Sequence, residues 1–142
     1  MKHIVLISCV KQKLPGKARA RDLYTSPLFR KHLAYAELLA PDAIYILSAK
    51  HGLLPLDAEE IEYYDQTLTA MSASEVRAWV QRVVEQLAQC ADLHNDYFIV
   101  LAGRAYCQPL ICHLRFYEVP FQGLPLGQRL QALARALKGG QQ

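Results

Sequence analysis

The chain has 142 residues, of which 52% are hydrophobic and 20% charged, and its formal net charge is +3. This length suits one domain with a sizeable core, and the composition excludes a disordered chain. No apolar stretch approaches the roughly 20 residues needed to cross a bilayer. The amino terminus also lacks the apolar core and cleavage site of a secretory signal. We therefore expect a cytoplasmic protein with no membrane partner, whose four cysteines are reduced thiols.

Short apolar runs alternate with segments of helical periodicity. In chain order we predict a strand over 3–9, a helix from Thr25 or Ser26 to near 40, a strand over 43–48, a helix from Ser72 or Ser74 to near 90, a strand over 97–102, a helix over 105–114, a strand over 116–120 and a helix over 126–137. The alternation predicts an α/β fold, a three-layer α/β/α sandwich with a mainly parallel four-stranded sheet. Residues 1–138 would form this single domain, with 49–68 as a long acidic loop and 139–142 as a flexible tail.

The first two predicted strands end in similar polar segments. The first runs into Ser8 and Cys9 with lysines at 11 and 13, and the second runs into the sequence Ser-Ala-Lys-His-Gly at 48–52. Ligands of open parallel sheets bind beyond the carboxyl ends of the strands. The two segments therefore predict a site for an anionic, hydrogen-bonding ligand. The first segment lacks the glycine-rich pattern of a P-loop, which argues against ordinary nucleoside triphosphate binding.

The segment that follows the second strand carries the clearest chemistry. Lys50 would hold an anion, and His51 would act as a general acid or base because imidazole titrates near neutrality. Gly52 would permit a tight turn or a close approach of the backbone to a ligand. The alternative is a plain loop in which Lys50 is solvated and His51 caps the turn.

Two further segments combine carboxylates with phenols. Asp22, with Tyr24 and Ser26 close by, is the only acid in a basic stretch and should stay ionised, so that it would orient a lysine or act as a general base. Helix capping also explains Ser26. In the long loop, Tyr64 would stack on a nucleobase and the Asp65 carboxylate would accept a hydrogen bond from the exocyclic amine of that base. The alternative is that these residues only anchor the loop.

The last two connections of the sheet suggest additional walls of the site. Gly103 and Tyr106 follow the third strand, and Gln128 and Arg129 open the final helix, where amides and a guanidinium can meet phosphate. The alternative for Arg129 is a surface position on an amphipathic helix. If the basic first loop and the C-terminal part converge, they form a basic face suited to phosphate. The alternative is that their charged side chains are dispersed over the solvated surface.

The cysteines match no zinc pattern, and we expect neither a metal nor a cofactor. Core packing explains Cys90, Cys107 and Cys112. Cys9 lies beside lysines that would lower its pKa and make it a nucleophile, although no histidine–acid pair accompanies it in the sequence.

Several segments together resemble a family of small uncharacterised bacterial domains. The pattern comprises Ser-Cys with a following Lys, Asp-Leu-Tyr-Thr-Ser, Leu-Ser-Ala-Lys-x-Gly-Leu, Tyr-Asp-x-Thr-Leu, Ala-Gly-x-x-Tyr and Gly-Gln-x-Leu, found here at 8–13, 22–26, 47–53, 64–68, 102–106 and 127–130. Tyr63 and Pro125 depart from it. More remotely, the layout is similar to uracil-DNA glycosylase-like domains and to the YaaA proteins. The resemblance implies work on nucleobases or nucleic acids and transfers no catalytic residue.

Two main hypotheses follow, and a weaker one. The first is an enzyme that acts on a nucleobase or its N-glycosidic bond, in DNA, tRNA or a free nucleotide; the second is a non-catalytic module that binds such a ligand; the third is a thiol enzyme that uses Cys9. The predicted catalytic residues are Asp22, His51 and Asp65. The predicted substrate-binding residues are Ser8, Cys9, Lys13, Tyr24, Ser26, Ser48, Lys50, Gly52, Tyr64, Gly103, Tyr106, Gln128 and Arg129.

Overall fold

A computed structural model describes residues 1–8, 17–18, 27–58, 61–62, 68–121, 124 and 126–140. Its centre is a five-stranded sheet in the order β4-β3-β1-β6-β7. These strands are β1 (His3–Ser8), β3 (Ala43–Ser48), β4 (Gly52–Pro55), β6 (Tyr97–Leu101) and β7 (Phe116–Glu118). A small antiparallel pair joins β2 (Lys17–Ala18) to β5 (Ile61–Glu62). The helices are α2 (Pro27–Leu38), α3 (Ala73–Ala88), α4 (Arg104–Ile111) and α5 (Leu126–Gly140), with a 3₁₀ turn η1 at Leu68–Ala70.

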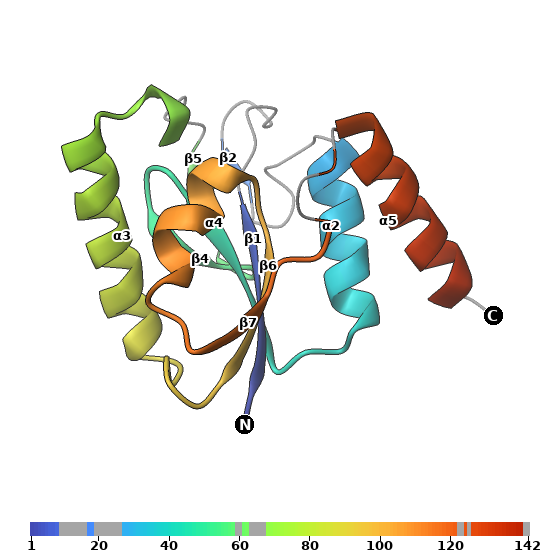
Figure 1. Cartoon of the computed structure of the whole chain (residues 1–142), viewed down its shortest axis with the longest axis horizontal. Coiled ribbons are helices and arrows are strands. Elements are labelled where there is room, and N and C mark those ends of the chain that lie inside the picture. The colour runs from blue at the N-terminus through green and yellow to red at the C-terminus, as the bar shows by residue number, and fades with distance from the viewer. Residues whose placement is uncertain are drawn as a thin grey trace.

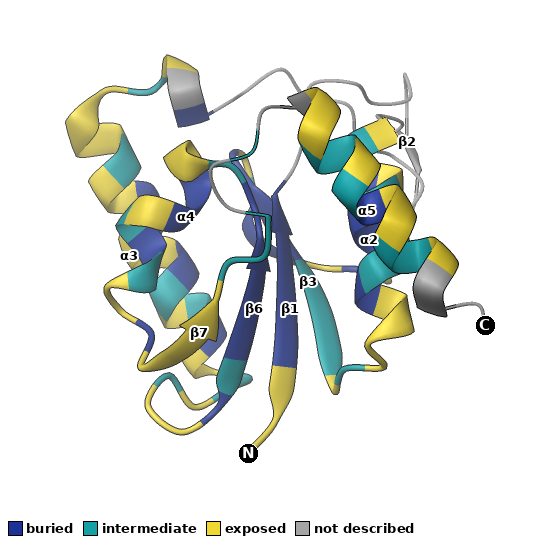
Figure 2. Ribbon diagram, turned by 45° about the vertical axis from the view of Figure 1, so that its right-hand side comes forward, coloured by how far each residue is buried: buried dark blue, intermediate teal, exposed yellow. Residues whose placement is uncertain are grey.

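The core forms around β1, which is the central strand. It pairs in parallel with β3 on one side and with β6 on the other, so that Ile7 lies between Ile46 and Leu101. All three of these side chains are buried, as expected for strands that are covered by helices on both faces. Figure 2 shows the buried strands between the two helical layers.

The three-layer arrangement is confirmed. Helices α2 and α5 pack together on one side of the sheet, and α3 and α4 pack on the other (Figure 1). The four predicted parallel strands are present at nearly the expected positions, and β7 joins β6 in parallel. The prediction of a four-stranded sheet was incomplete, because β4 adds a fifth, antiparallel strand at the edge.

The prediction that 49–68 is one long loop was wrong. Residues 52–55 form β4, which turns back on β3 as a hairpin, and 61–62 and 68–70 belong to β5 and η1. The hairpin forms because Gly52 adopts a φ of +73° and because Leu53 and Leu54 are buried. A four-residue strand followed by an acidic stretch gives a weak pattern, which is why it was read as loop.

The helix boundaries agree well with their sequence signals. Ser72 caps α3: its hydroxyl accepts from the Glu75 backbone N–H while the Glu75 carboxylate accepts from the Ser72 N–H. The buried stripe of α3 consists of Trp79, Val80, Val83 and Leu87. Helix α5 continues to Gly140, beyond its expected end at Leu137.

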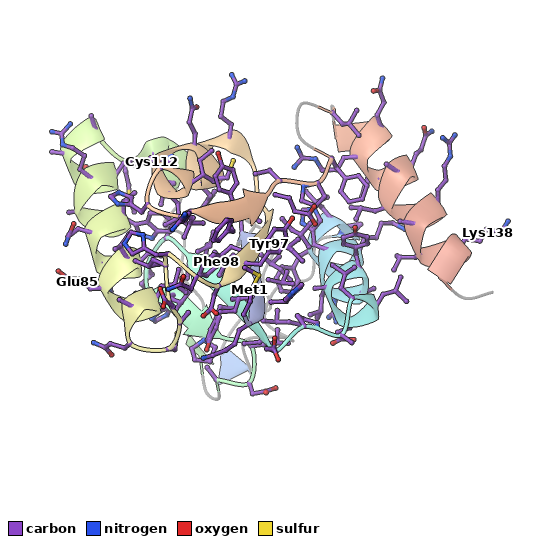
Figure 3. The ribbon with its side chains drawn as sticks, turned by 60° about the horizontal axis from the view of Figure 1, so that its bottom comes forward. Met1, Glu85, Tyr97, Phe98, Cys112 and Lys138 are labelled. Carbon is purple, nitrogen blue, oxygen red and sulfur yellow. The ribbon has the colours of Figure 1, made fainter. Side chains whose placement is uncertain are left out.

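The amino-terminal edge of the sheet is closed by hydrogen bonds. The carboxylate of Asp96 accepts from the backbone N–H of Asp92 and of Lys2, both at 2.8 Å, and these bonds lower its pKa. The ring of Tyr97 lies near that of His3. Figure 3 labels Tyr97 and Phe98 beside Met1 at this edge. In the described part of the chain, no helix has the length and apolar content needed to cross a membrane.

Candidate functional site

The strand order creates a topological switch point between β1 and β6. From β1 the chain passes through α2 to β3 on one side, and from β6 it passes through α4 to β7 on the other side. Connections that leave neighbouring strands in opposite directions open a crevice at the carboxyl ends, where such folds bind ligands. Helices α2 and α4 both begin at this end of the sheet, as does α5 (Figure 1).

The two serines lie together at the floor of this edge. In the parallel register Ser8 is opposite Leu47, which puts it beside Ser48 at the adjacent strand end. Both serines are buried. The hydroxyl of Ser48 accepts from the backbone N–H of His51 at 3.1 Å, and the carbonyl of Ser48 accepts from the indole N–H of Trp79 at 2.8 Å. Ser48 therefore helps to fix the turn that carries His51.

The turn with Lys50 and His51 is attached to α3 through its backbone. Arg82 donates to the carbonyl of Lys50 at 2.8 Å, and the amide of Gln86 donates to the carbonyl of His51 at 3.3 Å. The side chain of Lys50 is exposed. Gly52 has no room for a side chain beside Gln86, so its role here is the tight turn.

The environment of His51 favours its neutral form. Burial lowers the pKa of His51, and the positive charges of Lys50 and Arg82 lower it further. A neutral imidazole at physiological pH can accept a proton, which a general base must do. The acid–base role of His51 stays a prediction.

Tyr106 stands on the α3 side of the edge. Its ring meets that of Trp79 edge-to-face at a centroid distance of 5.8 Å, and it is only 9% exposed. Gly103 caps the amino end of α4 with extended backbone, and a Cβ atom there would meet nothing within 4 Å. The amino end of α4 is therefore open beside Tyr106.

Arg129 approaches the edge from the first turn of α5. Burial, and then the charge of Arg129, lower the pKa of His32 in α2 to about 4. Burial raises the pKa of Cys107 in α4, against the opposing charges of Arg129 and Arg104. The Nε atom of Arg129 is buried and has no hydrogen-bond partner among the described residues. Its neighbour Gln128 is exposed.

Sequence reasoning missed the burial of His32 and Trp79 and the exposure of Cys112. His32 is buried in α2, and a single histidine on a helix gives no signal of this. Cys107 is buried and Cys90 half-buried, but Cys112 is exposed, so its assignment to the core was wrong. Cys112 is the C-cap residue of the short helix α4.

Seven of the predicted site residues lie outside the described residues and stay predictions: Cys9, Lys13, Asp22, Tyr24, Ser26, Tyr64 and Asp65. The described residues contain no cluster of three or more histidine, cysteine or acidic side chains that could hold a metal. The described groups that the fold brings to this edge are hydroxyl, imidazole and guanidinium groups. Such groups bind and orient an anion, and the imidazole can also carry a proton.

The chain belongs to a family of unknown function, DUF6884, whose model matches residues 4–135. No curated protein and no solved structure matches the chain. The family match agrees with the resemblance to small uncharacterised domains and covers nearly the whole chain. It assigns no activity, so any function must be argued from the site.

Proposed function

We propose that the protein binds a phosphate-bearing nucleobase compound at the carboxyl edge of the sheet and acts on the base or its N-glycosidic bond. The ligand would be a nucleotide or a nucleotide unit of DNA or tRNA. Its phosphate would occupy the crevice at the switch point, and its base would lie toward the loop that follows the β3–β4 hairpin. The proposal needs no cofactor.

The observation that carries the proposal is Arg129. Its Nε atom is buried without a hydrogen-bond partner in the described structure, and burying such a donor unsatisfied costs about 1–3 kcal/mol. An anion that accepts from this donor would remove the cost and would add a charge-assisted bond. The amino ends of α4 and α5 would add favourable dipoles at the same edge.

His51 supplies the reactive group that the described structure supports. In its neutral form the His51 imidazole would take a proton from water. The resulting hydroxide would add to the sugar carbon, and the nucleobase would depart with the electron pair of the glycosidic bond. Asp22 and Asp65 are proposed to steady the developing positive charge on the sugar. Lys50, which is exposed at the turn, would hold a phosphate.

A second candidate is a non-catalytic nucleotide-binding or nucleic-acid-binding module. It is favoured by the chemistry of the described edge, where the hydroxyl and guanidinium groups are suited to holding a ligand. A thiol enzyme that uses Cys9 is the third possibility. Cys107 does not serve such an enzyme, because burial raises the pKa of its thiol and keeps it protonated.

A base-release assay separates these candidates. The protein would be incubated with modified nucleosides, nucleotides and oligonucleotides, and free base would be measured by chromatography. We expect release that falls at least about 100-fold in His51→Gln and in Asp22→Asn or Asp65→Asn, in line with the usual contribution of acid–base groups. The matched control Arg135→Gln, an exposed residue of α5, should retain activity.

Each other result points elsewhere. Salt-sensitive binding of an oligonucleotide without base release, unchanged in Asp22→Asn and Asp65→Asn, would establish the binding module instead of the enzyme. Loss of activity in Cys9→Ser with retention in both aspartate variants would establish the thiol enzyme. The absence of both binding and base release would refute the proposal as a whole.

A further inference from the structure

A groove lies between α3 and α4, on the face of the sheet opposite α2 and α5. It consists of two cavities of about 560 and 360 Å³, which share Val76 and Pro109 as lining residues. The larger cavity reaches Arg104 at the start of α4, and the smaller reaches Cys112 just after its end. Figure 3 labels Cys112 on this side of the molecule. Both volumes lie within the range of about 300–1,000 Å³ that is usual for small-molecule sites.

The floor of the groove is aliphatic, with Leu68, Val76, Val80, Ala105 and Pro109 exposing apolar surface to it. Val76 lies in the first turn of α3, on the same face as Trp79 and Val83, but it is only half-buried, whereas those two residues are buried. Helix α4 is only eight residues long and does not cover this surface. An apolar ligand would therefore remove from water a surface that the fold leaves exposed.

The rim of the groove is cationic. Arg104 lines one cavity and Arg77 the other, and no acidic residue lines either cavity in the described part of the chain. Within the same part, no carboxylate neutralises either guanidinium by an ion pair. Gln108 adds an amide group that can donate to an anion or accept from a ligand, whereas the amide of Gln81 already donates to the Glu85 carboxylate at 3.1 Å.

We propose that this groove is a second binding site, for a small organic anion with an apolar body. The apolar body would lie on the aliphatic floor at Val76 and Pro109, and the acidic group would pair with Arg104 or Arg77. Charge-assisted hydrogen bonds from arginine to an anion are stronger than those between neutral groups, and they would fix the orientation of the ligand. Among the described residues that line the groove, His113 has an aromatic ring and there is no phenylalanine, tyrosine or tryptophan, which disfavours a single-stranded nucleic acid, since such strands bind by stacking successive bases on aromatic rings.

The probe is 8-anilinonaphthalene-1-sulfonate, an aromatic sulfonate whose fluorescence rises in apolar sites. We expect saturable binding of one molecule to the folded protein. The double variant Arg77→Gln/Arg104→Gln should weaken it at least about tenfold, through the loss of charge-assisted bonds. Val76→Trp, which fills the groove, should weaken it to a similar extent. The control Arg135→Gln, on the opposite helical layer, should change the affinity less than about twofold.

A second readout does not depend on the fluorescence of the probe. Cys112 is exposed and lines the groove, whereas Cys107 is buried. Bound probe should therefore slow alkylation of Cys112 by iodoacetamide, as measured by mass spectrometry, and the protection should be lost in Arg77→Gln/Arg104→Gln. This measurement remains informative if Val76→Trp does not fold.

The proposal is overturned by any of three results. Equal affinities in wild type and in the double arginine variant would show that the cations play no part. Equal affinity for the uncharged analogue N-phenyl-1-naphthylamine would show a general apolar surface. Protection of Cys112 by an oligonucleotide but not by the sulfonate would assign the groove to nucleic acid. The function proposed at the sheet edge is independent of all three, because it depends on Arg129 and His51.

Discussion

Replacing Gly52 by alanine should destabilise the protein strongly, because two separate penalties meet at this residue. Its φ of +73° costs an L-residue about 1–2 kcal/mol. The added Cβ would also collide with the Oε1 atom of Gln86. That oxygen accepts from the backbone N–H of Leu53 at 2.8 Å, and displacing it would lose a hydrogen bond worth about 1 kcal/mol. We expect a total loss of about 2–3 kcal/mol in the free energy of unfolding.

The assay is urea denaturation followed by circular dichroism, with a double-mutant cycle. In a Gln86→Ala background the collision is absent, so Gly52→Ala should cost only the backbone term of about 1–2 kcal/mol. Gly127→Ala is the matched control, because a Cβ there meets nothing within 4 Å and the residue lies in the first turn of α5. It should be neutral or stabilise by up to about 1 kcal/mol. An equal cost of Gly52→Ala in both backgrounds would refute the argument from the collision with Gln86. A cost below about 0.5 kcal/mol would refute that argument and the one from the positive φ of Gly52.

Two further predictions concern buried groups of the core. The pKa of His32 is lowered to about 4, so below pH 6.5 the unfolded chain binds a proton that the folded chain does not; stability should fall by about 3 kcal/mol between pH 6.5 and 4. Urea midpoints at these two pH values should show that His32→Gln removes this part of the loss, and an unchanged pH dependence would contradict it. Trp79→Phe removes the bond to the Ser48 carbonyl and should cost about 1–3 kcal/mol. Because Trp79 is the only tryptophan, circular dichroism must report its unfolding, and a cost near zero would show that the bond is not needed.

Most of the fold could be predicted because its strands and helices have distinct periodicities. The run at 4–7 is buried on both faces, and Ser72 with Glu75 gives a capping box that fixes the start of α3. The β4 strand was missed because its four residues begin with Gly52 and end with Pro55, which together resemble a turn. Trp79 could have been found, since it lies three residues after Val76 on the same helical face.

The candidate site could be predicted only at the level of its edge. The strand ends at Ser8 and Ser48 were placed correctly by the rule for parallel sheets, and the register makes them neighbours. The proximity of Arg129 to His32 could not be predicted, because it depends on how α5 packs against α2. Periodicity gives each helix a buried face but does not say which helices meet. Contacts between elements distant in sequence are tertiary information.

The central claim is that Arg129 receives the phosphate of a nucleobase compound at the carboxyl edge. The most direct test is calorimetric titration with a nucleoside monophosphate and with the same nucleoside lacking phosphate, for the wild type and for Arg129→Gln. We predict that the substitution weakens nucleotide binding at least about tenfold and changes nucleoside binding less than about twofold. Arg135→Gln should change neither. Equal weakening of both ligands, or no weakening of either, would contradict the claim.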